Sequence, residues 1–200
     1  MRSPRKDARY HRAKAEGFRA RSAYKLAELD DRHRILRRGD VVVDLGAWPG
    51  GWLQVASARV GSGGRVVGVD LVEIPALDAP NLSLLTGDVR DAATIEAVRG
   101  AAGAPARIVL SDLAPKLTGI RDTDDARSTE LVTSVLDALP VLLEPGGSLV
   151  AKLFMSSDYK TLVERLQREF QEVKTTRPES TRRGSAELYA VCRGYRAPCG

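Results

Sequence analysis

Cysteine and histidine are scarce in this chain of 200 residues, and their scarcity excludes several kinds of site. The two cysteines, Cys192 and Cys199, are too few for a disulfide framework or a cysteine-rich zinc site. The two histidines, His11 and His33, do not stand at metal-ligand spacing with them. We therefore expect a protein that works without a metal ion.

Long apolar runs are also missing, which excludes other classes of protein. No run approaches the ~20 residues of a membrane-spanning helix, and residues 1–14 hold no apolar stretch typical of a signal peptide. No G-x-x-x-x-G-K-[ST] motif predicts nucleoside triphosphate binding. The content of 43% hydrophobic and 28% charged residues is that of a globular protein. We expect a cytoplasmic domain over 22–200 behind a basic extension over 1–21, with no membrane contact.

Charge is distributed unevenly along the chain, although the net charge is only +5. Residues 1–38 carry 13 basic and 5 acidic side chains, and residues 174–200 carry 6 basic and 2 acidic ones. The middle, residues 39–173, carries 12 basic and 19 acidic side chains. Basic ends favour a polyanionic partner. The acidic middle favours a ligand that is cationic or rich in hydroxyl groups.

Short apolar runs alternate with helical patterns from residue 40 onward. Strands are expected at 41–46, 65–71, 81–88, 106–115, 148–154, 171–176 and 186–194. Helices are expected at 22–33, 51–60, 91–102, 124–143 and 158–170. This order predicts an α/β fold with a mostly parallel sheet. The last two strands are joined by only nine residues, which is short for a parallel crossover, so the last strand is expected to be antiparallel.

A glycine-rich loop over 44–52, DLGAWPGGW, follows the first expected strand. Gly46 and Gly50 let the backbone approach a ligand there, although the spacing is not the dinucleotide-binding G-x-G-x-x-G. Asp70 and Asp88 end the next two strands, and a carboxylate at such a position commonly binds ribose hydroxyls. A structural turn and helix-capping or solvated aspartates are the plain alternatives. Taken together, the loop and the two acids favour a nucleoside ligand.

Three further ionisable residues are expected at the same edge of the sheet. Asp112 follows the fourth strand, Lys152 lies near the end of the apolar run LVAKLF, and Glu187 opens the antiparallel last strand. A lysine within an apolar strand is unusual, because a buried charge needs a partner. It could simply be a surface-reaching lysine paired with Asp112. The alternative is a functional lysine able to take up a proton.

Motifs along residues 9–194 resemble the FtsJ/RrmJ (RlmE) family of ribosomal RNA ribose 2′-O-methyltransferases. The matching segments are RSAYKL (21–26), VVDLGAWPGGW (42–52), VDL (69–71), GDVRD (87–91), SDLAP (111–115), ARSTELV (126–132), LEPGGSLVAKLF (143–154) and PESTRRGSAELYAV (178–191). The resemblance implies a Rossmann-like methyltransferase fold with a seven-stranded, mostly parallel sheet and helices on both faces. It also implies S-adenosylmethionine as the methyl donor.

The resemblance further implies a Lys-Asp-Lys-Glu tetrad, which falls on Lys25, Asp112, Lys152 and Glu187. Lys152 would be the base or the nearest stabiliser of the developing alkoxide in an in-line methyl transfer. The cofactor contacts implied or expected are Gly46, Gly50, Trp52, Asp70, Asp88 and Asp112. Two residues depart from the family pattern. Trp48 stands where a small residue is usual, so that it either reshapes the pocket or turns outward, and Lys116 stands where asparagine is common.

An RNA partner would explain the basic ends. We expect RNA contacts from Arg9, Arg12, Arg19, Arg21, Lys116, Arg182 and Arg183. Because only 5% of residues are aromatic, recognition is expected to rest on backbone, shape and the ribose hydroxyl. The expected substrate is a uridine of large-subunit rRNA, within a ribosomal particle, and the enzyme is expected to be monomeric.

Three other functions compete with this interpretation. The first is 2′-O-methylation of a tRNA anticodon loop, which close relatives of the family perform. The second is a catalytically silent RNA-binding protein for ribosome assembly, which the intact tetrad disfavours. The third is a small-molecule methyltransferase, which would leave the net charge of +8 over residues 1–38 without a purpose.

Overall fold

A computed structural model describes residues 15–116, 118–181 and 184–198 of the chain. The RNA contacts predicted at Arg9, Arg12, Arg182 and Arg183 lie outside these ranges. Within them, no helix combines the length and the apolar character that crossing a membrane requires.

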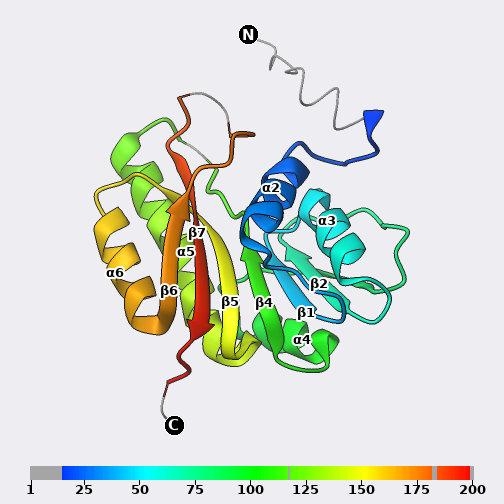
Figure 1. Ribbon diagram of the computed structural model, residues 1–200. Coiled ribbons are helices and arrows are strands. Elements are labelled where there is room, and N and C mark those ends of the chain that lie inside the picture. The colour runs from blue at the N-terminus through cyan, green and yellow to red at the C-terminus, as the bar shows by residue number, and fades with distance from the viewer. Residues whose placement is uncertain (1–14, 117, 182–183, 199–200) are drawn as a thin grey trace.

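A seven-stranded sheet forms the centre of the molecule (Figure 1), in the order β3-β2-β1-β4-β5-β7-β6. The strands are β1 (Val41–Leu45), β2 (Arg65–Asp70), β3 (Leu82–Thr86), β4 (Ala106–Ser111), β5 (Leu143–Phe154), β6 (Phe170–Thr176) and β7 (Glu187–Tyr195). The first five are mutually parallel, and β7 runs antiparallel to both β5 and β6. The predicted antiparallel last strand is therefore confirmed. It starts at the edge where the parallel strands end.

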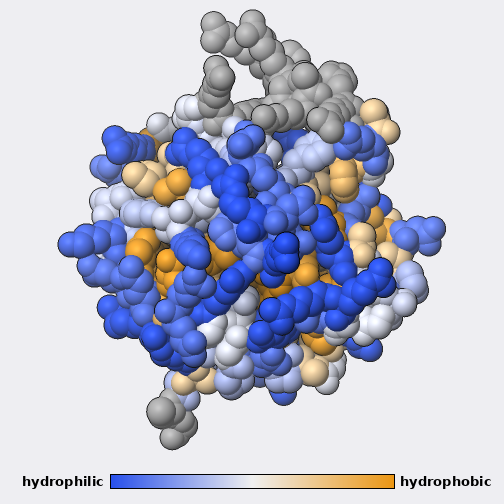
Figure 2. All heavy atoms as spheres, in the orientation of Figure 1, coloured by the Kyte–Doolittle hydropathy of each residue, from blue (hydrophilic) through white to orange (hydrophobic). Residues whose placement is uncertain are grey.

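Helices cover both faces of the sheet, as predicted. They are α2 (Ala23–His33), α3 (Gly51–Val60), α4 (Ala92–Ala102), α5 (Arg121–Leu142) and α6 (Tyr159–Glu169). One apolar cluster joins the sheet to α4, α5 and α6, and the other joins it to α2 and α3. Neighbouring side chains of one strand therefore enter different cores, as Val42 and Val43 of β1 do. Figure 2 shows hydrophilic side chains over most of one view of the molecule, with hydrophobic ones in a band across its middle.

Two elements begin three or more residues earlier than the sequence predicts. Helix α5 starts at Arg121 instead of residue 124, with Asp122 and Asp124 in its first turn, where acidic side chains favourably meet the positive end of the helix dipole. Strand β5 starts at Leu143, which pairs with Ala106 before an irregularity in the register. Residues 144–147, between the expected helix and the expected strand, thus belong to β5.

Candidate active site

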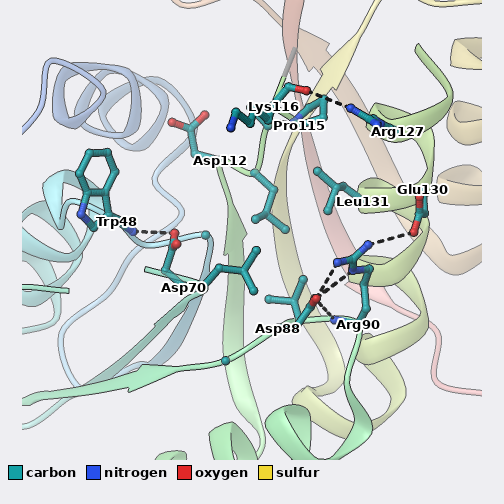
Figure 3. A pocket seen from close by; sticks show the side chains of 16 residues that line it. Trp48, Asp70, Asp88, Arg90, Asp112, Pro115, Lys116, Arg127, Glu130 and Leu131 are labelled. Carbon is teal, nitrogen blue, oxygen red and sulfur yellow. Dashed lines mark hydrogen bonds and ion pairs between the residues drawn. The ribbon is translucent and has the colours of Figure 1, made fainter. Parts of the chain in front are cut away.

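A cavity of about 680 Å³ opens at the carboxyl ends of the parallel strands (Figure 3). Of the predicted cofactor-binding residues, Gly46, Asp70, Asp88 and Asp112 line it, and Lys116 lines it as well. Helix α5 closes one side through residues that include Glu130. The volume lies within the range of about 300–1,000 Å³ usual for sites that enclose a small molecule.

Glycine is required where the cavity meets the loop after β1. Gly46 has φ 86°, and a Cβ atom there would lie 2.6 Å from the Leu113 side chain. Gly50 precedes α3 with φ 107°, a conformation that other residues adopt only with strain. Trp52, on the next turn, is 3% exposed and donates its indole N–H to the Ser22 carbonyl. Gly50 and Trp52 are not among the residues that line the cavity, so their cofactor contacts remain predictions.

The Asp70 carboxylate accepts hydrogen bonds from two loops that border the cavity, the one between β1 and α3 and the one between β2 and β3. Its Oδ2 accepts a hydrogen bond from the Trp48 backbone N–H at 3.0 Å, and its Oδ1 accepts one from the Val72 N–H at 2.9 Å. Each oxygen keeps a further acceptor position. The carboxylate is therefore held in place at the cavity wall, with capacity left for hydroxyl donors of a ligand.

Asp88 is held by an arginine that the sequence analysis did not single out. Arg90 donates to both carboxylate oxygens, at 2.6 Å to Oδ2, and it reaches Glu130 on α5 at 3.3 Å. These hydrogen bonds from Arg90 lower the pKa of Asp88. Asp88 is thus ionised and oriented at neutral pH. The sequence signal for this contact was the spacing, because Arg90 follows Asp88 by two residues in a turn before α4.

Asp44, on β1, is a buried carboxyl with no partner. It is 0% exposed, and neither oxygen has a hydrogen-bond partner among the described residues. The strand register places it opposite Gly68 and Leu110, two residues below Asp70 and Asp112 on the same face of the sheet. Burial, and then the charges of Asp112 and Asp70, raise the pKa of Asp44 well above its usual range. Asp44 therefore keeps its proton to higher pH than an exposed aspartate, and a cationic ligand above it would favour its ionised form.

The predicted tetrad comes together as two ion pairs beside this cavity. The Lys25 Nζ lies 2.8 Å from Glu187 Oε2, and the Lys152 Nζ lies 3.0 Å from Asp112 Oδ1. Lys152 also donates to the Asp112 carbonyl at 2.7 Å. Both lysines are 6% exposed, so each depends on its partner to offset the loss of hydration. The four residues come from α2, the end of β4, β5 and β7.

Tyr189, which the sequence analysis missed, joins the two ion pairs. Its hydroxyl donates to Asp112 Oδ1 at 2.6 Å and accepts a hydrogen bond from Lys25 Nζ at 3.0 Å. The side chain is 0% exposed, and burial together with the charge of Asp112 raises the pKa of Tyr189 far above its usual value. It therefore stays a neutral donor. The available signal was the strand period of two, which puts Tyr189 on the same face as Glu187.

The basic residues predicted to contact RNA fall into different surroundings. Arg19 donates its guanidinium N–H groups to the backbone carbonyls of Pro49, Pro75 and Ala76. Arg21 lies near enough to Tyr189 to influence its hydroxyl electrostatically. Lys116 lines the cavity, where its carbonyl accepts a hydrogen bond from Arg127 at 3.4 Å. RNA contact by these residues remains a prediction. The guanidinium of Arg19 already hydrogen-bonds to backbone carbonyls within the domain.

Two other predictions concern Trp48 and metal ions. Trp48 is 53% exposed, and Figure 3 shows its ring pointing away from Asp88 and Arg90. Trp48 also lines the cavity, so both alternatives for this departure from the family pattern, a reshaped pocket and an outward ring, stay open. Among the described residues, no group of three or more histidine, cysteine, aspartate or glutamate side chains could hold a metal ion.

Comparison with known proteins identifies close relatives. Residues 18–195 match the family described as FtsJ-like methyltransferase. Three curated proteins named ribosomal RNA large subunit methyltransferase E are similar over most of the chain. The one from Methanothrix thermoacetophila is 46% identical, covering 96% of this chain and 73% of its own. Those from Anaeromyxobacter sp. and Methanobrevibacter smithii are 44% and 42% identical, covering 96% and 92% of this chain and 69% and 88% of their own.

Solved structures share the fold. A crystal structure named as a candidate ribosomal RNA methyltransferase of Plasmodium falciparum is 27% identical with a TM-score of 0.77, covering 89% of this chain and 98% of that one. A fibrillarin of Aeropyrum pernix with natively bound S-adenosyl-L-methionine is 19% identical with a TM-score of 0.63, covering 86% and 76%. At that identity the likeness concerns the fold alone.

Proposed function

Because this chain belongs to the FtsJ-like methyltransferase family, we propose that it methylates a ribose 2′-hydroxyl of large-subunit ribosomal RNA, at a uridine. The observation that carries the proposal concerns Asp112, which lines a cofactor-sized cavity and pairs with Lys152. The Tyr189 hydroxyl connects Asp112 to the Lys25–Glu187 pair. The relatives are named as large-subunit methyltransferases. We further propose that it acts in the cytoplasm, as a monomer, on a ribosomal particle.

The residues that line the cavity fit S-adenosylmethionine. When bound, this cofactor supplies a methyl group already activated as a sulfonium. Asp70 keeps acceptor positions for ribose hydroxyls, and Asp88 is ionised by its contact with Arg90. The buried, unpartnered carboxyl of Asp44 lies beneath the cavity beside Asp70 and Asp112, whose charges help to raise its pKa. A cationic ligand would offset the charges of Asp70 and Asp112.

In the proposed reaction, the Nζ of Lys152 contacts the 2′-oxygen of the substrate. In its neutral form Nζ accepts the hydroxyl proton, and in its protonated form it donates a hydrogen bond to the developing negative charge. Asp112 fixes Lys152 through both its side chain and its carbonyl, which leaves one N–H or lone pair of Nζ for the substrate. Glu187 holds Lys25, and the Tyr189 hydroxyl fixes the distance between the two pairs.

A variant Lys152→Ala tests the assignment of the base. We expect transfer of tritiated methyl to purified large-subunit particles to fall ~10²–10⁴-fold, the usual contribution of a general base. Binding of S-adenosylhomocysteine, measured by calorimetry, should change little. Lys160→Ala is the matched control, because Lys160 is an exposed lysine on α6. A folded Lys152→Ala protein that methylates at the normal rate would overturn the assignment.

The substrate is tested separately from the chemistry. Purified large-subunit particles, naked large-subunit rRNA and tRNA are each incubated with the enzyme and labelled cofactor. We expect methylation of the particle, mapped as a 2′-O-methyluridine by alkaline resistance of the adjacent bond. Methylation of tRNA alone would replace the proposed substrate with an anticodon loop, and the absence of methylation on all three RNAs would contradict the proposed activity.

A further inference from the structure

Arg19 stands within the basic N-terminal part of the chain, but its guanidinium is bound to backbone within the domain. It donates to the carbonyl of Pro49, in the loop between β1 and α3, and to those of Pro75 and Ala76, in the loop between β2 and β3. A planar guanidinium with five N–H donors can bridge several carbonyl oxygens at once. One side chain thus joins two loops that are remote in sequence.

These two loops are the ones that border the cavity on the side of Asp70. From the cavity side, the Asp70 carboxylate bridges them through the backbone N–H groups of Trp48 and Val72. The loops also pack closely, because a Cβ atom at Gly50 would lie 3.0 Å from the Leu77 side chain and 3.3 Å from Arg19. Asp70 and Arg19 therefore form two bridges between the same loops.

The segment that carries Arg19 is itself fixed to the domain. The Arg19 backbone N–H donates to Gln54 Oε1 at 2.8 Å, and Gln54 Nε2 donates to the Gly17 carbonyl at 2.9 Å. Gln54 lies on α3, the helix that begins directly after the glycine-rich loop. The ring of Phe18 also packs edge-on against Tyr24 of α2, with 5.5 Å between the centroids. The guanidinium is thus presented from an anchored backbone.

We propose that Arg19 is a positioning residue for the cofactor, which sets the Asp70 carboxylate by fastening the β1–α3 loop to the β2–β3 loop. Without Arg19, the two loops would have to be ordered when the ligand binds, and that ordering lowers affinity. The inference rests on cofactor binding within the proposed function and does not depend on which RNA is methylated. It gives Arg19 a role besides the RNA contact predicted for this residue.

The first test measures binding of S-adenosylhomocysteine to the full chain by calorimetry, without RNA. We expect Arg19→Ala to weaken binding ~10-fold or more, which is the loss expected when a hydrogen bond from a charged group is removed. Arg19→Lys should recover only part of this loss, because a single ammonium cannot span three carbonyls in two loops. Arg99→Ala is the control, since Arg99 lies on α4 and pairs with Glu96. Unchanged affinity in both Arg19 variants would overturn the proposal.

A second measurement separates positioning from a general loss of structure. If Arg19 acts by placing Asp70, then Arg19→Ala combined with Asp70→Asn should weaken binding much less than the product of the single effects. Millimolar guanidinium should also restore part of the affinity of Arg19→Ala. Effects that multiply fully would refute the coupling. Because no RNA is present, a failure of the proposed substrate leaves this result unaffected.

Discussion

Asp44 offers the sharpest test of the electrostatics, through the substitution Asp44→Asn. The carboxyl is 0% exposed and has no hydrogen-bond partner among the described residues, and its pKa is raised well above the ordinary 3.8 by burial and by Asp112 and Asp70. A group whose pKa is raised on folding stabilises the protein fully only below its unfolded pKa. That stability is lost as the pH rises toward the folded pKa.

The magnitude follows from the linkage relation. Each pH unit between the two pKa values removes about 1.4 kcal/mol from the free energy of unfolding. Between pH 5 and pH 7 the wild-type protein should therefore lose up to about 2.7 kcal/mol through this single group. Asparagine has nearly the same shape and does not titrate. The difference in stability between Asp44→Asn and wild type should thus increase by that amount, in favour of the variant.

Urea unfolding of the cofactor-free protein at pH 5, 6 and 7 measures this difference. Subtracting the wild-type curve removes the contributions of titrating groups that do not act on Asp44, and it leaves those of Asp44 and of its coupling to Asp112 and Asp70. Asp122→Asn, at an exposed position in the first turn of α5, should give a curve parallel to wild type. If Asp44→Asn also ran parallel to wild type, within about 0.5 kcal/mol, Asp44 would have an ordinary pKa and the account of the carboxylate cluster would be refuted.

Two further predictions concern aromatic residues. Tyr189→Phe removes the hydroxyl between Lys25 and Asp112 and should lower the methylation rate ~10–100-fold, the equivalent of a hydrogen bond to a charged group. Tyr195→Phe, at the other end of β7, should leave the rate unchanged, and equal rates for the two variants would contradict the role of Tyr189. Acrylamide should quench the fluorescence of Trp48, 53% exposed, and spare Trp52, 3% exposed. Trp48→Phe should therefore abolish the quenchable fraction, and a quenchable fraction that survived would place Trp48 elsewhere.

The sheet and the cofactor edge could be predicted because their signals are local. Each of these signals occupies one continuous stretch of sequence: the β-branched run of β1, the glycines that follow it, the aspartate that ends β2 and the aspartate that follows β3. The short link before β7 fixed its direction, because a parallel crossover needs more residues than that link contains. Asp112, Lys152 and Glu187 could be brought to one edge by the same topological reasoning.

Hydrogen bonds between distant segments could not be predicted in this way. Lys25 reaches Glu187 across 162 positions of the sequence, and Tyr189 reaches Asp112 across 77. Burial of Lys25 on α2 is a further example, because a lysine in a helix gives no local signal that it will be buried. The ion pair with Glu187 offsets the loss of hydration there.

The sequence by itself determined the fold and the edge at which the cavity opens, and it brought Asp112, Lys152 and Glu187 to that edge, because strand order, glycine placement and residue type are properties of the chain. Only the tertiary structure decided which charges neutralise one another. Arg19 carries the same charge as its basic neighbours, but its bonds to three carbonyls separate it from them. Asp44 resembles Asp70 in type, but burial without a partner gives it a different pKa. Such differences arise from burial and from partners remote in sequence, and neither exists before the chain folds.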